Sequence, residues 1–188
     1  MKFNLFSEIK FLKGEEILRR YFVMNSFDGV LTTLGILFGS FISNSIVPSL
    51  IVRIVIATGI AMFISGFFGT YLTESSERKR EIKELEKAMV KKFENSTLQK
   101  IASKISIISA FVDGISPLIA SIVTIIPFFL GIDPFVSFYA SVSIAFGLLF
   151  LLGSYLSKIS KERIVIGGLK MLLAGIAAAL LILLVGEV

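Results

Sequence analysis

The sequence contains no cysteine and no histidine among its 188 residues. The absence of cysteine excludes disulfides and thiolate chemistry, and the absence of histidine excludes imidazole metal ligands and imidazole proton transfer. A metal ion bound by this chain must therefore use oxygen ligands, with methionine sulfur as an additional donor. The chain also lacks a glycine-rich phosphate loop and any arrangement typical of nucleophilic catalysis. We therefore expect neither an enzyme nor a permanently bound cofactor.

Apolar residues dominate what is present. Hydrophobic residues make up 55% of the chain and the mean hydropathy is +0.88, whereas a soluble domain reaches roughly 45–50% only when glycine is included. A membrane-spanning helix needs about 20 mostly apolar residues. Five stretches meet this requirement, approximately Tyr21–Ile42, Ser49–Leu72, Ile105–Leu130, Phe135–Leu156 and Ile164–Gly186. The sequence thus predicts an all-α, polytopic membrane protein with five transmembrane helices.

One connection between these stretches is long and polar. Residues 73–104 are rich in Glu, Lys and Arg, which predicts a helix that continues the second span into the cytosol and then a turn near Asn95-Ser96-Thr97. The predicted organisation has four parts: residues 1–20, spans one and two in 21–72, a cytosolic helical insert in 73–104, and spans three to five in 105–186.

Residues 1–20 are too charged to be a span or a cleavable signal. Apolar and basic side chains alternate in this segment, which favours a helix lying in the headgroup plane of the bilayer. A flexible basic tail is the alternative.

The net charge of +5 follows the predicted topology. All but two of the 19 basic residues precede span one, or lie between spans two and three or four and five. The positive-inside rule then places the N-terminus in the cytoplasm and the C-terminus outside. Because topology explains the basic charge, we do not expect nucleic acid as a partner. Short loops and the absence of a targeting segment favour a prokaryotic plasma membrane.

Four charged residues lie inside the predicted spans: Asp28, Arg53, Asp113 and Lys170. Such residues are costly and usually functional. Arg53 is near the outer end of its span, where its side chain can reach the interface. Counting from the last basic residue before each span, Asp28 and Asp113 lie roughly 12–14 Å from the cytosolic edge. Two carboxylates at one depth can share a cation or a proton.

The neighbours of these aspartates suit a metal pathway. Met24, Asp28 and Thr32 are spaced to lie on one helical face. Pro117 cannot donate a hydrogen bond to the Asp113 carbonyl, which leaves a backbone oxygen beside that carboxylate. The second span brings further residues to similar depth, namely Met62, Ser65, Gly66 and Gly69, and its small residues permit close helix packing.

Two alternatives remain for the aspartates. Lys170 lies at similar depth and could neutralise one of them, but not both. An intramembrane aspartyl hydrolase also uses two aspartates, although Asp28-Gly29 and Asp113-Gly114 are the only repeated signature here.

An acidic stripe is predicted on the helical insert, because its glutamates are spaced three, four and three residues apart: Glu74, Glu77, Glu81 and Glu84. One interpretation is a solvated helix with ion pairs such as Glu77–Arg80 and Arg80–Glu84. The other is a metal-collecting surface at the mouth of a pore.

The segment Asp28-Gly-Val-Leu-Thr-Thr-Leu-Gly-Ile-Leu-Phe-Gly39 resembles the first-span motif of the vacuolar iron transporter family. Two further segments are similar to the family's second span and closing helix, residues 57–73 and 168–175. The resemblance implies export of Fe²⁺, sometimes Mn²⁺, in exchange for protons. It also implies a homodimer, a pathway aspartate at Asp28, and metal-binding glutamates on the insert, for which Glu81 and Glu84 match best.

The chain also departs from the family's pattern. The family usually has glutamate where this chain has Thr58 and methionine where it has Gly66, and the insert is shorter than in plant members. Asp113 is not part of the family's pattern. We hypothesise that Asp113 and Met62 replace the missing ligands. The leading prediction is a Fe²⁺/Mn²⁺ transporter; the alternatives are a membrane scaffold that has kept the fold without transport, and the hydrolase.

Overall fold

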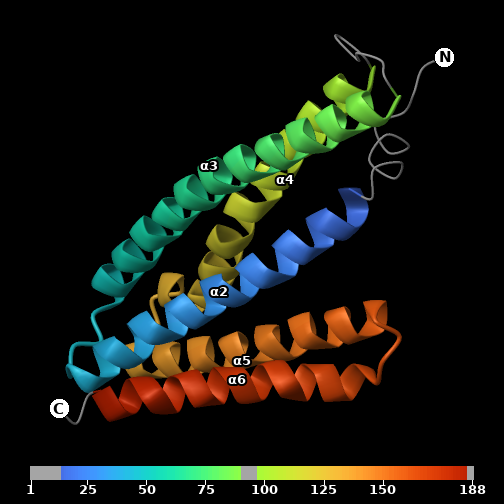
Figure 1. Ribbon diagram of the computed structural model, residues 1–188. Coiled ribbons are helices and arrows are strands. Elements are labelled where there is room, and N and C mark those ends of the chain that lie inside the picture. The colour runs from blue at the N-terminus through green and yellow to red at the C-terminus, as the bar shows by residue number, and fades with distance from the viewer. Residues whose placement is uncertain (1–13, 90–96, 186–188) are drawn as a thin grey trace. The chain divides into compact units, whose positions relative to one another are not determined.

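The computed structural model describes residues 14–89 and 97–185. Regular structure in these ranges is helical throughout (Figure 1): α2 (Gly14–Ile42), α3 (Pro48–Met89), α4 (Thr97–Thr124), the 3₁₀-helix η1 (Ile126–Phe129), α5 (Pro134–Ile159) and α6 (Ile164–Val185). The five α-helices are long and apolar enough to cross a membrane. The predicted all-α fold with five membrane-spanning helices is confirmed.

Two predictions fall partly outside the described residues. Of the segment 1–20, the structure describes residues from Gly14, and these form the start of α2 without a break before the first span. The turn predicted near Asn95-Ser96-Thr97 lies mostly outside the described residues, because the structure does not describe residues 90–96. Its last residue, Thr97, is the first residue of α4.

Helix α3 is a single helix of 42 residues. It passes the predicted end of the second span at Leu72 and continues to Met89, so the predicted helical extension of that span is present. At 1.5 Å per residue, α3 is roughly 60 Å long, about twice the hydrocarbon thickness of a bilayer. Its charged second half therefore has to extend beyond the membrane.

The third span was predicted as a single helix that ends near Leu130, and the structure differs from this prediction. Helix α4 ends at Thr124, and η1 follows. Pro127 explains the break, because its ring disfavours the α conformation at the preceding residue. Helix α5 begins sharply at Pro134: the Asp133 carboxylate accepts hydrogen bonds from the backbone N–H groups of Phe135 (2.9 Å) and Val136 (3.2 Å), which makes Asp133 an N-cap.

The described chain divides into two compact units. The first contains the residues up to Phe22 and Phe63–Ile115, and the second contains Val23–Met62 and the residues from Ser116 onward. Helices α2, α3 and α4 each contribute residues to both units, whereas α5 and α6 belong to the second unit alone.

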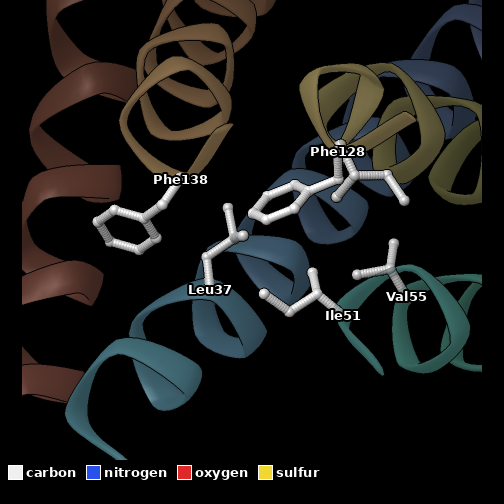
Figure 2. Packing of buried hydrophobic residues seen from close by; sticks show 6 residues of the cluster. Leu37, Ile51, Val55, Phe128 and Phe138 are labelled. Carbon is white, nitrogen blue, oxygen red and sulfur yellow. The ribbon is translucent and has the colours of Figure 1, made fainter. Parts of the chain in front are cut away.

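The second unit has an apolar core contributed by α2, α3, η1 and α5. Figure 2 shows Leu37, Ile51, Val55, Phe128 and Phe138 packed together, each at most 6% exposed. Helices α5 and α6 run side by side (Figure 1) and approach closely at Gly153 and Gly167, where a Cβ on Gly167 would lie 2.6 Å from the Gly153 carbonyl oxygen. Small residues allow this backbone approach.

In the first unit, α3 and α4 are equally close. A Cβ on Gly114 of α4 would lie 2.6 Å from the Phe63 carbonyl oxygen of α3 and 3.2 Å from the Phe67 nitrogen. This contact is next to Asp113 and fixes the distance between the two helices at that level.

Candidate functional site

Asp28 lies on a face of α2 that is exposed in the described residues of the second unit. Because α2 is continuous, Met24, Asp28 and Thr32 follow one another along that face. Met24 is 57% exposed, Asp28 is exposed and Thr32 is half-buried. The other side of the helix is packed, with Val30 fully buried. The Asp28 carboxylate therefore points away from the core of its own unit.

The residue after Asp28 is fixed against α4. A Cβ on Gly29 would lie 2.7 Å from the Cα of Pro117, so only glycine fits there. The Gly29 carbonyl oxygen accepts hydrogen bonds from the hydroxyls of Thr33 (2.8 Å) and Ser121 (3.1 Å). This contact sets the rotation of α2 and directs Asp28 outward.

Asp113 is buried in the first unit, with 6% exposure. Its carboxylate accepts a hydrogen bond of 2.8 Å from the Thr70 hydroxyl on α3. A Cβ on Gly66 would lie 2.9 Å from the same carboxylate oxygen. The missing side chain at position 66 thus provides the space for the Asp113 carboxylate.

The sequence predicted Gly66 at a depth similar to that of Asp113, without predicting their contact, and it missed Thr70. The signal was available, because Thr70 follows Gly66 by one helical turn and so lies on the same face of α3. Gly69 has no atom within 4 Å of its Cβ position, so it does not take part in this contact.

Asp28 belongs to the second unit and Asp113 to the first, so the sharing of one ion by the two carboxylates stays a prediction. The same holds for Met62, a half-buried residue of the second unit that was paired with Asp113 in the ligand hypothesis. Lys170 is exposed, and within the described residues of the second unit no ion pair joins it to Asp28.

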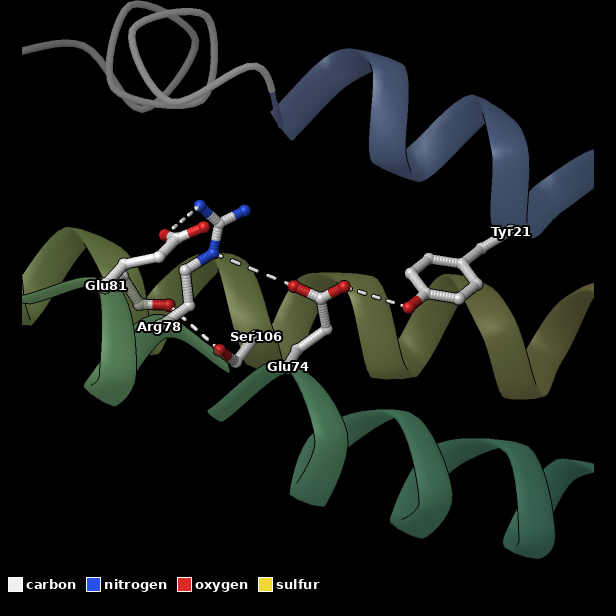
Figure 3. Close-up of polar contacts among 6 residues, drawn as sticks. Tyr21, Glu74, Arg78, Glu81 and Ser106 are labelled. Atoms are coloured by element: carbon white, nitrogen blue, oxygen red, sulfur yellow. Dashed lines mark hydrogen bonds and ion pairs between the residues drawn. The ribbon is translucent and has the colours of Figure 1, made fainter. Parts of the chain in front are cut away.

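Each glutamate of the acidic stripe on α3 forms an ion pair with one of two arginines, Arg78 or Arg80. Glu74 and Glu81 lie 3.7 Å and 3.2 Å from the Arg78 guanidinium, and the Tyr21 hydroxyl donates a hydrogen bond of 2.9 Å to Glu74 (Figure 3). Glu74 and Arg78 are each 8% exposed, so this ion pair is buried. Sequence reasoning missed both the pair and Tyr21, which comes from α2.

The exposed part of the stripe follows the prediction. Arg80 lies 3.8 Å from Glu77 and 3.3 Å from Glu84, and these three side chains are more than half exposed. The predicted ion pairs Glu77–Arg80 and Arg80–Glu84 are thus confirmed. In the described ranges, no group of three or more acidic side chains is arranged to hold a metal ion.

These features define an integral, multi-pass, helical membrane protein with carboxylates inside its spans. The VIT family model matches residues 84–187 of the chain. An uncharacterized protein of Methanocaldococcus jannaschii is 35% identical over 181 residues, which cover 95% of this chain and 93% of that protein. No solved structure matches the chain.

The chain belongs to the VIT family, a family of metal-ion transporters, as the residues around Asp28 suggested. The family match begins inside α3 and does not include Asp28 or its motif. The role of Asp28 therefore depends on the motif and on the geometry of α2.

Proposed function

We propose that this chain exports a divalent metal ion, Fe²⁺ or Mn²⁺, from the cytosol in exchange for protons, with Asp28 as the central ligand. The observation that carries the proposal is the exposure of Asp28 on a membrane-spanning helix. A carboxylate facing lipid is costly, so such a position calls for a function and a partner. Met24 and Thr32 add a thioether and a hydroxyl to the same face, and ferrous iron accepts such mixed donors.

A second copy of the chain is the partner that suits this face. An isologous contact between two copies would cover the face with its own equivalent. It would also bring two Asp28 carboxylates to one interface, and their two negative charges match a divalent cation. This supports the homodimer that the family resemblance implies.

Asp113 is the second candidate ligand. Its carboxylate occupies the space beside Gly66, the position at which the family usually has methionine. The methionine side chain is absent at position 66, and the Asp113 carboxylate lies in the space that it would fill. This supports the replacement of a thioether ligand by a carboxylate ligand, rather than the loss of the metal site. The scaffold hypothesis relied on the missing ligands at Thr58 and Gly66 and on a Lys170–Asp28 pair. Asp113 offers a donor beside Gly66, and no ion pair joins Lys170 to Asp28 within the described residues of the second unit.

The glutamates of α3 differ in how available they are to a metal ion. The side chain of Glu74 is 11% exposed and held by Arg78 and Tyr21, so we assign it a structural role. Those of Glu77, Glu81 and Glu84 are 55%, 57% and 67% exposed. Exposed ion pairs contribute only about 0–1 kcal/mol to the free energy of unfolding. A metal ion could therefore displace the arginine that pairs with each of these three carboxylates. They would collect metal on the cytosolic side.

The remaining topology follows from charge. With the basic connections inside, the N-terminus is cytoplasmic and the C-terminus is outside. The archaeal relative is in keeping with a prokaryotic plasma membrane as the location.

Flux into proteoliposomes tests the proposal. The wild-type chain should transport Fe²⁺ or Mn²⁺, and a pH gradient of the correct direction should increase the rate. Asp28→Asn keeps the side-chain shape but removes the charge, and it should lower flux at least about tenfold, the low end of the effect of altering a metal-ligand environment. Asp113→Asn should also lose transport while the protein still inserts and dimerises.

Glu162→Gln is the matched control, because it removes an exposed carboxylate from the short connection between α5 and α6. It should transport like wild type. Absence of flux from the wild-type chain under every gradient would favour the scaffold hypothesis. Normal flux in Asp28→Asn would remove Asp28 from the pathway without removing transport.

A further inference from the structure

A pocket of about 570 Å³ lies between α3 and α4 in the first unit. It begins at Tyr71, near the predicted end of the apolar part of α3, and extends along the charged part of that helix. Its size is that of a site for a small organic ligand rather than for a bare ion.

Basic side chains dominate the charge of the pocket. Arg78, Lys79 and Lys83 line it from α3, and Glu86 is the one acidic residue of the lining. Glu74 and Glu81 already neutralise Arg78. Lys79 and Lys83 form no ion pair with any residue in the described ranges, and Glu86 is the single carboxylate that lines the pocket with them.

The positions of the two lysines favour a shared anionic ligand. They are four residues apart on one helix, so their side chains are neighbours and repel each other. Side chains of a helix lean toward its N-terminus, which on α3 is the direction of Tyr71 and the membrane. An anion between the two ammonium groups would remove their repulsion.

Neutral hydrogen-bond donors complete the lining. Ser75 on α3 and Ser103 on α4 contribute hydroxyls, and Gln99 contributes an amide. Ammonium groups together with hydroxyl and amide donors are suited to an oxyanion, and charge-assisted hydrogen bonds to phosphate are strong. The same positive charge opposes the entry of a divalent cation, so this pocket is distinct from the proposed metal pathway.

We propose that this pocket binds a phosphate-bearing anion, either the headgroup of an anionic phospholipid or a free phosphate ester. Basic pockets between membrane helices on the cytoplasmic side are known to suit anionic headgroups. The inference depends on the pocket and its charge, and it does not require that the chain transports metal.

Native mass spectrometry of the purified full-length chain tests the inference, with phosphatidylglycerol and phosphatidylcholine as probes. Wild type should retain phosphatidylglycerol in preference to phosphatidylcholine. Lys79→Ala/Lys83→Ala should weaken phosphatidylglycerol binding by about 30-fold, or roughly fivefold for each lysine near the membrane surface. Alanine preserves helix propensity, and circular dichroism would verify that the helix content is unchanged.

The control variant is Lys87→Ala/Lys100→Ala. It removes two exposed charges from the same two helices, but neither residue lines the pocket. It should bind phosphatidylglycerol like wild type. An equal loss of binding in both double variants would overturn the inference, because it would show attraction to surface charge alone.

Glycerol 3-phosphate distinguishes the two sources of phosphate. If the ligand is a lipid, phosphatidylglycerol binds and the soluble ester at equal concentration does not displace it. If the ligand is a free phosphate ester, glycerol 3-phosphate binds, its binding is lost in Lys79→Ala/Lys83→Ala, and phosphatidylglycerol shows no preference. Identical behaviour of this variant and wild type toward both probes would refute the site.

Discussion

Asp28 and Asp113 are both carboxylates in membrane-spanning helices, but their surroundings differ. Asp113 is 6% exposed, accepts a hydrogen bond from Thr70, and lies in a space made by Gly66. Asp28 is exposed, and no ion pair in the described part of the chain involves it. Asp113 thus has a partner within its own unit, whereas the described residues supply no ion-pair partner for Asp28.

The difference extends to the units that contain these residues. In the first unit, the buried Glu74 pairs with the buried Arg78 and accepts a hydrogen bond from the half-buried Tyr21. Within the described residues of the second unit, Met24 and Asp28 are exposed on one face of α2 and Asp28 forms no ion pair. A stability measurement on the isolated chain should therefore respond strongly to polar changes in the first unit and weakly to changes on that face.

Arg78 offers the largest expected effect. Arg78→Gln leaves the Glu74 carboxylate buried beside no cation, and the loss of one partner of a buried pair should cost about 3 kcal/mol of unfolding free energy. Arg80→Gln, two residues further on, breaks exposed pairs and should cost less than about 0.5 kcal/mol. Unfolding in detergent, followed by circular dichroism, measures both. Equal costs would show that burial of the Arg78 group is not what stabilises the first unit.

Gly66 provides the second comparison. Gly66→Met places atoms where the Asp113 carboxylate lies, and overpacking should cost about 2 kcal/mol. Gly69→Met on the same helix meets open space and should change the unfolding free energy little. In an Asp113→Ala background the cost of Gly66→Met should fall below about 1 kcal/mol. The difference between the two costs is the coupling free energy, and about 1 kcal/mol is typical of residues in contact. Additive costs in this double-mutant cycle would contradict the shared space.

Two threonines give the smallest and most direct test. Thr70→Val removes the donor to Asp113 with little change of shape and should cost about 1.5 kcal/mol, as hydrogen bonds to charged groups do. Thr32→Val makes the same change on the uncovered face beside Asp28 and should leave the stability of the isolated chain unchanged. A cost at Thr32 similar to that at Thr70 would mean that the Asp28 face is already packed within one chain.

Much of the fold could be predicted from the sequence because it depends on local patterns. Long apolar runs identified the five spans, and the charge pattern predicted the helical extension of α3. The Arg80 ion pairs followed from residues three and four positions apart on one helix. The end of α4 at Thr124 was missed, although Pro127 carries the local signal for it.

The site could be predicted only in part. The residue types of Asp28 and Asp113 were readable, but their exposure depends on which face of each helix packs, and their common depth stays a prediction. In α4 the sequence did carry a signal for the packed face, because Ser109, Asp113 and Ser116 are spaced four and three residues apart and all three are buried. The contacts of Thr70 with Asp113 and of Tyr21 with Glu74 join residues 43 and 53 positions apart. Such contacts depend on the packing of different helices, which no local pattern specifies.

The shared space of Gly66 and Asp113 also constrains the order in which sequences can change. In a chain with methionine at position 66, an aspartate at 113 would have to compete for the same space, at a cost of about 2 kcal/mol. The two changes are therefore easier to acquire through a small residue at position 66, and relatives should rarely combine a large residue there with an aspartate opposite it.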